Sequence, residues 1–95
     1  MLKAQAQVTT PKAARYLKAL CNHFSRKVTA EYDDNHGTVQ FGIGDCEMVA
    51  DAAALVIRIQ AANAENLAQV KYVVSDHLER FAVDEALQVT WVDAS

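Results

Sequence analysis

Residues 38–60, TVQFGIGDCEMVADAAALVIRIQ, contain three runs in which apolar and polar side chains alternate. A period of two is typical of strands that bury one face of a sheet. The segments 42–45 and 51–53 separate the runs, and glycine in the first segment favours the positive φ angle of a tight turn. The stretch therefore predicts an antiparallel meander. Its inward sets are Val39, Phe41 and Ile43; Cys46, Met48 and Ala50; and Leu55, Ile57 and Ile59.

The alternation continues on both sides of this stretch. Upstream, Val28, Ala30 and Tyr32 form another inward set before a predicted turn at residues 34–37, to whose His36 we assign no role. Residues 3–9 and a last run around 87–92 alternate in the same way, so both ends of the chain are predicted to add strands. The inward sets of these two runs are Ala4, Ala6 and Val8, and Leu87, Val89 and Trp91.

Two segments have a period close to 3.6 instead. Apolar side chains recur every three or four residues from 11 to 27 and again from 63 to 82, which predicts two amphipathic helices. Thr10 followed by Pro11 is a typical helix start, and Asn63 is a typical N-cap. Asp76 and Arg80 are placed for an i,i+4 ion pair.

The element order is therefore β-α-β-β-β-β-α-β. About six strands with one polar face and two helices cannot form a doubly wound parallel sheet, which needs cover on both sides. We expect one α+β domain over residues 1–95, a two-layer sandwich whose mainly antiparallel sheet carries both helices on one face. Val49, Val56 and Val92 on the other face mark a modest dimer contact, so we expect a monomer or a weak homodimer.

Composition narrows the class of protein. The chain has 95 residues, of which 52% are hydrophobic and 22% charged, which excludes disordered and fibrous classes. No apolar run approaches the roughly 20 residues that cross a bilayer, and residues 1–10 do not form a signal-peptide core. Two cysteines are too few for the disulfide framework of a small secreted domain. We therefore expect a cytoplasmic protein without a membrane partner.

Basic and acidic side chains are unevenly distributed along the chain. Residues 1–28 contain six Lys or Arg and no acid, whereas residues 29–95 contain three basic and twelve acidic side chains. A basic binding face would produce this pattern, and so would a basic helix packed beside acidic loops, which is the interpretation we favour. The net charge of −3 makes nucleic acid an improbable partner.

The residue types of a zinc site are present in Cys21, His23, Cys46 and His77. Helix positions i and i+2 differ by about 200°, so Cys21 and His23 cannot easily aim at one point. Cys21 also lies in an apolar stripe, where burial raises a thiol pKa and disfavours a nucleophile. No loop has the pattern of a phosphate cradle. We predict neither a metal nor a cofactor.

His23 and His77 each fall at the margin of a helix's apolar stripe. The side chain of such a histidine is half buried, and its charge state is sensitive to neighbouring groups. A purely structural role is the more common one. The alternative is a cleft between the helices that binds a small anion, with Lys27, Arg80 and Glu85 as further candidate ligand-binding residues.

The chain resembles a family of small bacterial proteins, domain of unknown function 2218. The resemblance rests on residues 15–17, 20–24 and Lys27 in the first helix, and on residues 77–82, Glu85 and Trp91 near the end. Val83 and Asp84 depart from it, because members typically have an aromatic residue and an arginine there. The resemblance implies a TATA-binding-protein-like α+β fold and no established activity. It also implies an association with siderophore and iron-uptake proteins.

The leading hypothesis is a non-enzymatic accessory or binding domain in the bacterial cytoplasm, because no nucleophile, base and metal constellation converges. Its partner would be a protein or a small anionic ligand. The alternative is a small enzyme or ligand sensor that uses the anion-binding cleft between the helices.

Overall fold

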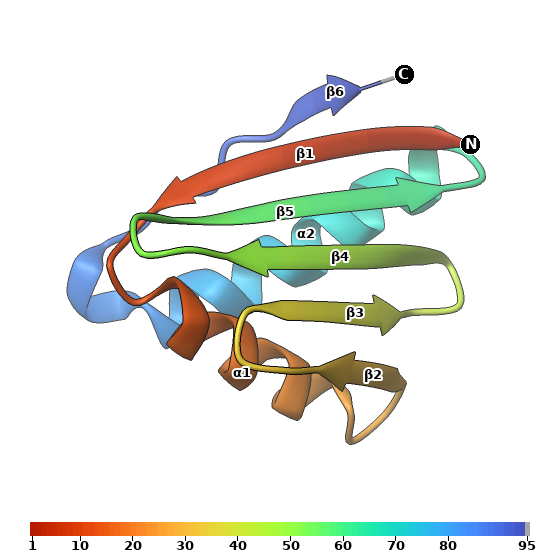
Figure 1. Cartoon of the computed structure of the whole chain (residues 1–95). Helices are drawn as coiled ribbons and strands as arrows, with labels where there is room; N and C mark the ends of the chain where they lie inside the picture. The colour runs from red at the N-terminus through yellow and green to blue at the C-terminus, as the bar shows by residue number, and fades with distance from the viewer. Residues whose placement is uncertain (95) are drawn as a thin grey trace.

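The computed structural model describes residues 1–94 and confirms the predicted order of six strands and two helices (Figure 1). A single 3₁₀ turn, η1, follows the second helix. The elements are β1 (Leu2–Thr9), α1 (Ala13–Phe24), β2 (Thr29–Tyr32), β3 (His36–Gln40), β4 (Gly44–Ala50), β5 (Ala54–Ala61), α2 (Ala64–Phe81), η1 (Val83–Glu85) and β6 (Val92–Ala94).

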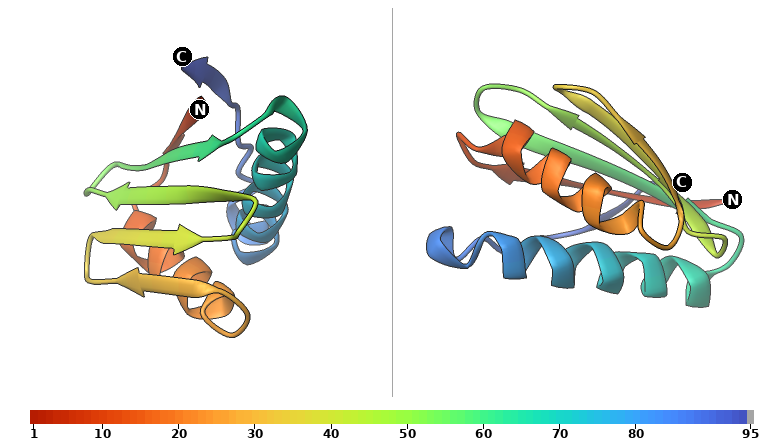
Figure 2. Two further views of the ribbon diagram at one scale, coloured as in Figure 1. Left: turned by 90° about the vertical axis from the view of Figure 1, so that its right-hand side faces the viewer. Right: turned by 90° about the horizontal axis from the view of Figure 1, so that it is seen from below.

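The six strands form one open sheet in the order β2-β3-β4-β5-β1-β6. Every described pairing is antiparallel, and β1 pairs with β5 along its whole length, from Leu2 opposite Ala61 to Thr9 opposite Ala54. Both helices lie on one face of the sheet and run antiparallel to each other (Figure 2). The predicted two-layer α+β class is therefore confirmed, and we call the opposite side of the sheet the outer face.

The core lies between the sheet and the helices. The alternating inward side chains of β4 and β5 meet the apolar stripes of α1 and α2, as the two periodicities predicted. Met48, Leu55 and Ile57 from the sheet are fully buried there. So are Leu17 and Leu20 of α1, and Val70, Val74 and Leu78 of α2.

Helix α1 is shorter than predicted at both ends. Thr10 is not its N-cap. The hydroxyl of Thr10 accepts a hydrogen bond from the backbone N–H of Lys12 at 3.1 Å, which forms a turn that delays the helix until Ala13. At the other end, the N–H groups of Arg26 and Lys27 donate to carbonyls three residues back, so the last turn tightens and the helix ends at Phe24. Helix α2 has its predicted cap, since the Asn63 side chain accepts from the N–H of Asn66.

The turn between β2 and β3 lies earlier than predicted. The Asp33 carboxylate accepts from the N–H groups of Asn35 and His36 at 3.0 and 2.8 Å, which closes the turn before His36. His36 and Gly37 are therefore strand residues. Gly37 is buried, and a Cβ there would lie 2.7 Å from the Sγ of Cys21, so the strand requires glycine for close packing on α1.

Several residues predicted to point inward are less buried than expected, among them Tyr32, Phe41 and Ile43. Tyr32 is 44% exposed at the end of the edge strand β2. Ile43 is 37% exposed because it lies in the hairpin loop after β3, and Phe41 is half buried just beyond the strand end. Phe41 still packs on α1, with its ring centroid 5.0 Å from that of Phe24.

The last strand is shorter and later than predicted. Leu87, Val89 and Trp91 do pack against the core, but only Val92–Ala94 pairs with β1. The segment before β6 lies against α2 instead, where the indole N–H of Trp91 donates to the Ser75 hydroxyl at 2.7 Å. Within the described chain, neither helix combines the length and apolar character that a bilayer crossing requires.

Candidate functional site

The structure places His23 and His77 side by side. His23 lies in the last turn of α1 and His77 in the second half of α2, and the antiparallel arrangement of the helices brings these two positions together. Their ring centroids are 4.8 Å apart, with an angle of 44° between the ring planes. We call these two residues the histidine pair. It lies at the helix–helix boundary because both residues are at the margins of their apolar stripes.

Two phenylalanines flank the histidine pair. The Phe24 ring is buried below it, with centroids 5.0 Å from His77 and 5.7 Å from His23 in edge-on geometry. Phe81 lies beside His23 at 5.8 Å and is 41% exposed. The pair therefore has an apolar floor and one apolar side that faces solvent.

His77 has a defined tautomer. Its Nδ1 lies 2.7 Å from the carbonyl oxygen of Val73, one helical turn back, and this bond requires a proton on Nδ1. In the neutral ring the Nε2 atom is then an acceptor, and in the charged ring it is a second donor. The half-buried imidazole is thus held in place and can offer Nε2 to a ligand.

His23 is exposed, contrary to the predicted half-buried position, but partial desolvation still lowers its pKa, and the positive charges of His77, Arg26 and Lys27 lower it further. Each nearby positive charge makes protonation of the His23 ring less favourable. At neutral pH the His23 ring is therefore mostly neutral in the free protein. A negative charge placed on the pair would reverse this effect and favour the protonated ring.

The two cationic side chains named from the sequence lie at the same ends of the helices as the histidine pair. Lys27 is exposed and contributes to the electrostatic environment of His23. Arg80 follows His77 on α2 and makes the predicted i,i+4 pair with Asp76, at 3.2 Å between Nη2 and Oδ2. Its side chain remains 71% exposed, so the guanidinium is accessible to a ligand at a modest cost in this surface ion pair.

Glu85 does not join the histidine pair. The turn η1 returns the chain to the start of α1, where the Glu85 carboxylate accepts hydrogen bonds from the hydroxyls of Thr10, at 3.1 Å, and Tyr16. The hydrogen bond to Glu85 and burial raise the pKa of Tyr16 to about 12. His23 is at the opposite end of α1, so Glu85 joins two chain segments and the structure does not bring it to the other four candidate residues.

The two thiols are buried and unreactive. Burial raises the pKa of Cys21 to about 11. Burial, together with the neighbouring Cys21 and Glu47, also raises the pKa of Cys46. Both thiols are therefore protonated at neutral pH and poor nucleophiles. Over residues 1–94, no three His, Cys, Asp or Glu side chains are grouped so that they could hold a metal ion.

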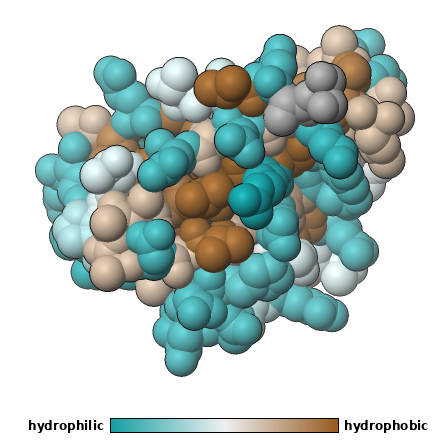
Figure 3. All heavy atoms as spheres, turned by 45° about the horizontal axis from the view of Figure 1, so that its top comes forward, coloured by the Kyte–Doolittle hydropathy of each residue, from teal (hydrophilic) through white to brown (hydrophobic). Residues whose placement is uncertain are grey.

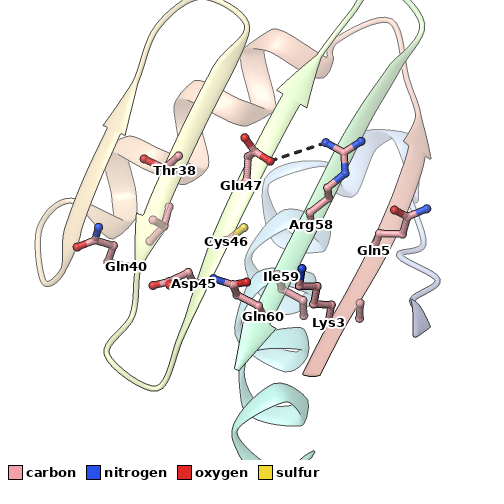
Figure 4. A pocket seen from close by; sticks show the side chains of 12 residues that line it. Lys3, Gln5, Thr38, Gln40, Asp45, Cys46, Glu47, Arg58, Ile59 and Gln60 are labelled. Atoms are coloured by element: carbon pink, nitrogen blue, oxygen red, sulfur yellow. Dashed lines mark hydrogen bonds and ion pairs between the residues drawn. The ribbon is translucent and has the colours of Figure 1, made fainter. Parts of the chain in front are cut away.

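A shallow groove of about 510 Å³, which the sequence did not predict, crosses the outer face (Figure 4). Polar side chains from β1, β3, β4 and β5 line it. The alternating polar positions of these strands were a visible signal, but alternation alone does not distinguish a groove from a flat face. The lining includes Lys3, Gln40, Asp45, Glu47, Arg58 and Gln60.

His36 has a defined partner on this face, contrary to its predicted place in a turn. Its Nε2 lies 2.9 Å from one carboxylate oxygen of Glu47, and Arg58 lies 3.7 Å from the other (Figure 4 shows the latter pair). All three side chains are about half exposed, so the cluster is a surface network of modest strength.

Comparison with known proteins places these features in a family. The model of a family described as "Uncharacterized protein conserved in bacteria (DUF2218)" matches residues 5–92. The chain belongs to the DUF2218 family. The match includes both helices, and therefore the histidine pair and the two cationic residues beside it. The predicted resemblance is confirmed.

A solved structure of a similar chain has the same fold. The NMR structure of PA4090 from Pseudomonas aeruginosa superposes with a TM-score of 0.82 and 33% sequence identity, covering 97% of this chain and 96% of that one. No curated protein matches the chain. The family's description names no activity, so the function must be argued from the site itself.

Proposed function

We propose that this DUF2218 domain is a small, non-enzymatic cytoplasmic binding module that takes a small anion, a carboxylate or a phosphate, on the histidine pair. One observation carries the proposal. Two imidazole rings from different helices lie 4.8 Å apart at the protein surface, with cationic side chains around them. Such an arrangement becomes more favourable when a negative charge is added to it.

The geometry of His77 supports an anion as the ligand. Because its Nδ1–H is committed to Val73, its Nε2 can become a charge-assisted donor only through protonation, and a bound anion stabilises that proton. His23 would gain a proton for the same reason. The ligand would therefore be held by two imidazolium donors, with Lys27 and Arg80 contributing charge from the rim.

The aromatic side of the site suits an anion with an apolar body. Phe81 is 41% exposed and its ring lies 5.8 Å from that of His23. Ligand sites commonly combine apolar contact area with a few oriented polar groups. A carboxylate that carries an alkyl or aryl group would place that group against Phe81.

The predicted association with siderophore and iron uptake has no support in the comparisons with known proteins. Neither the description of the family nor that of the Pseudomonas structure mentions iron uptake, and an anion site on the histidine pair does not depend on it. A cytoplasmic setting agrees with two buried cysteines whose raised pKa values keep them as thiols.

The test is an NMR titration of ¹⁵N-labelled protein at pH 6.5 with inorganic phosphate, acetate and benzoate. The ring resonances of His23 and His77 should shift together and saturate, while those of His36 on the outer face should not. His77→Gln should abolish the shift of His23, and His36→Gln is the matched control that should leave binding unchanged. Two results would contradict the proposal. One is equal shifts of all three histidines, and the other is no shift at a ligand concentration of about 50 mM, which would saturate a site of millimolar dissociation constant.

A further inference from the structure

The outer face is ordered in rows that run across the strands. One row joins Glu31, Thr38, Glu47, Arg58 and Gln5 through direct cross-strand pairing. A second row joins His36, Val49, Val56 and Gln7, and a third joins Thr29, Gln40, Asp45, Gln60 and Lys3. Within each row the side chains are neighbours on the same face.

Charge is divided between the two halves of these rows. The acidic residues Glu31, Asp45 and Glu47 lie on β2 and β4, whereas the basic residues Arg58 and Lys3 lie on β5 and β1. A partner of uniform charge, such as a nucleic acid or an acidic peptide, would be attracted by one half and repelled by the other. A partner that fits must carry the same division in reverse.

A pair of apolar side chains lies at one end of the boundary between the two halves. Val49 and Val56 are direct cross-strand partners on β4 and β5, and Val49 is 36% exposed. The space-filling view from the β6 side shows apolar atoms gathered on the visible face and surrounded by hydrophilic side chains (Figure 3). Exposed apolar side chains beside polar and charged ones are typical of protein–protein interfaces.

We propose that the occupant of the outer face is a second copy of this chain, docked face to face about a two-fold axis that runs parallel to the strands between β4 and β5. This rotation reverses the order of the strands and keeps each row at its own height. It therefore places β4 of one copy over β5 of the other, so that Glu47 faces Arg58 of the second copy and Val49 faces its Val56. Each contact occurs twice, as an isologous interface requires.

The area of the face indicates a weak, reversible dimer. Strands spaced about 4.8 Å apart and rising about 3.3 Å per residue give β3, β4, β5 and β1 a face on the order of 500 Å² per copy. A total near 1,000 Å² is at the low end for specific association. The groove between Lys3 and Asp45 would remain hydrated in the dimer.

Sedimentation equilibrium up to about 1 mM at low salt tests the proposal, a range that brackets weak interfaces. The wild type should show a monomer–dimer equilibrium. Arg58→Glu and Glu47→Arg should each weaken it by about tenfold or more, because every swapped charge meets a like charge across the axis. An equimolar mixture of the two variants should dimerise again, since the heterodimer restores both opposite-charge contacts.

Arg15→Glu and Glu79→Arg are matched controls, because they make the same charge changes on exposed positions of the helix layer. They should leave the dissociation constant within about twofold of the wild type. Thermal unfolding by circular dichroism verifies that each variant is folded. A wild type that stays monomeric at 1 mM, a control that dissociates the dimer equally, or a mixture that remains monomeric would overturn the proposal.

Discussion

His23 and His77, which belong to different helices, lie with their ring centroids 4.8 Å apart. The contact exists because α1 and α2 run antiparallel and each histidine is at the edge of an apolar stripe. It places two imidazole rings where the positive charge of His77 helps to lower the pKa of His23.

The pKa of His23 leads to a prediction about stability and pH. Burial and the cations His77, Arg26 and Lys27 lower this pKa in the folded protein, so the unfolded chain binds the proton more tightly. The free energy of unfolding should therefore fall as the pH drops below about 6.5, the ordinary histidine pKa, and level off below the folded-state value. The effect should be small, because the site is exposed.

Urea unfolding of the wild type and of His23→Gln at pH 7.5 and pH 5 measures this effect. Asp76, Glu79 and Arg80 are charged residues within three positions of His77 in α2, and their charges also affect how stability depends on pH. The difference between the two proteins, rather than the wild type alone, therefore isolates His23. The variant should lose less stability on acidification than the wild type. The opposite difference would mean that His23 gains a favourable partner when charged.

The core predicts large costs for truncation. Leu20, Ile57 and Leu78 are each fully buried between the helices and the sheet. Replacement of any one by Ala should destabilise the fold by about 2–5 kcal/mol through lost transfer energy and cavity formation. Midpoints of urea denaturation close to the wild-type value for all three would refute this description of the core.

Gly37 should resist even the smallest side chain. A Cβ at this position would lie 2.7 Å from Cys21 Sγ and 3.2 Å from a methyl group of Leu17. Gly37→Ala should therefore cost about 1–3 kcal/mol through overpacking. In a Cys21→Ala background, where the Sγ atom is gone, the additional cost of Gly37→Ala should be smaller, and a double-mutant cycle of unfolding free energies measures the difference. Strictly additive costs would mean that the thiol is not the obstacle.

The sequence predicted the elements better than their arrangement. Periodicity located the strands and helices because a segment that buries one side has apolar residues at the period of its secondary structure. The period is two in Cys46–Ala50 and close to 3.6 in α2. The turn at Asp33 was misplaced, because Gly37 has the residue type of a turn and only its packing against Cys21 shows that it belongs to a strand. The position of β1 between β5 and β6 depends on pairing between distant segments, which no local pattern records.

The candidate site residues show the same limit of local sequence patterns. His23, His77, Lys27 and Arg80 were grouped from their positions on two helix flanks. The structure brings the two histidine rings together and keeps Lys27 within electrostatic reach of His23, whereas Arg80 pairs with Asp76. Glu85 was grouped with them because it follows α2, but η1 turns the chain back to Thr10 and Tyr16. The outer groove was missed, because polar residues that alternate along a strand have the same pattern whether they line a groove or a flat surface.

Tyr16 and Glu85 make a prediction at high pH. The hydrogen bond to Glu85, with burial, raises the pKa of Tyr16 to about 12. Because the unfolded chain loses this proton near pH 10, the stability contributed by the neutral phenol should be lost as the pH rises from about 10 towards 12. Glu85→Gln should lower the pKa of Tyr16, which ultraviolet titration near 295 nm detects as the difference between variant and wild type. An unchanged titration curve would show that this hydrogen bond does not govern Tyr16.

The same Glu85→Gln variant should bind anions as the wild type does, because Glu85 lies at the opposite end of α1 from the histidine pair. Its histidine resonances in a phosphate titration should therefore follow the wild-type curve. A lost response in a folded Glu85→Gln protein would place Glu85 in the site after all.

The pKa of His23, measured by NMR in the absence and in the presence of saturating phosphate, tests the anion site most directly. A bound anion replaces the repulsion among His23, His77, Arg26 and Lys27 by attraction, so the pKa of His23 should rise, while the ring resonances of His36 on the outer face should not respond to phosphate. A His23 pKa that is the same with and without phosphate, or His36 ring resonances that respond to phosphate as strongly as those of His23, would contradict the account.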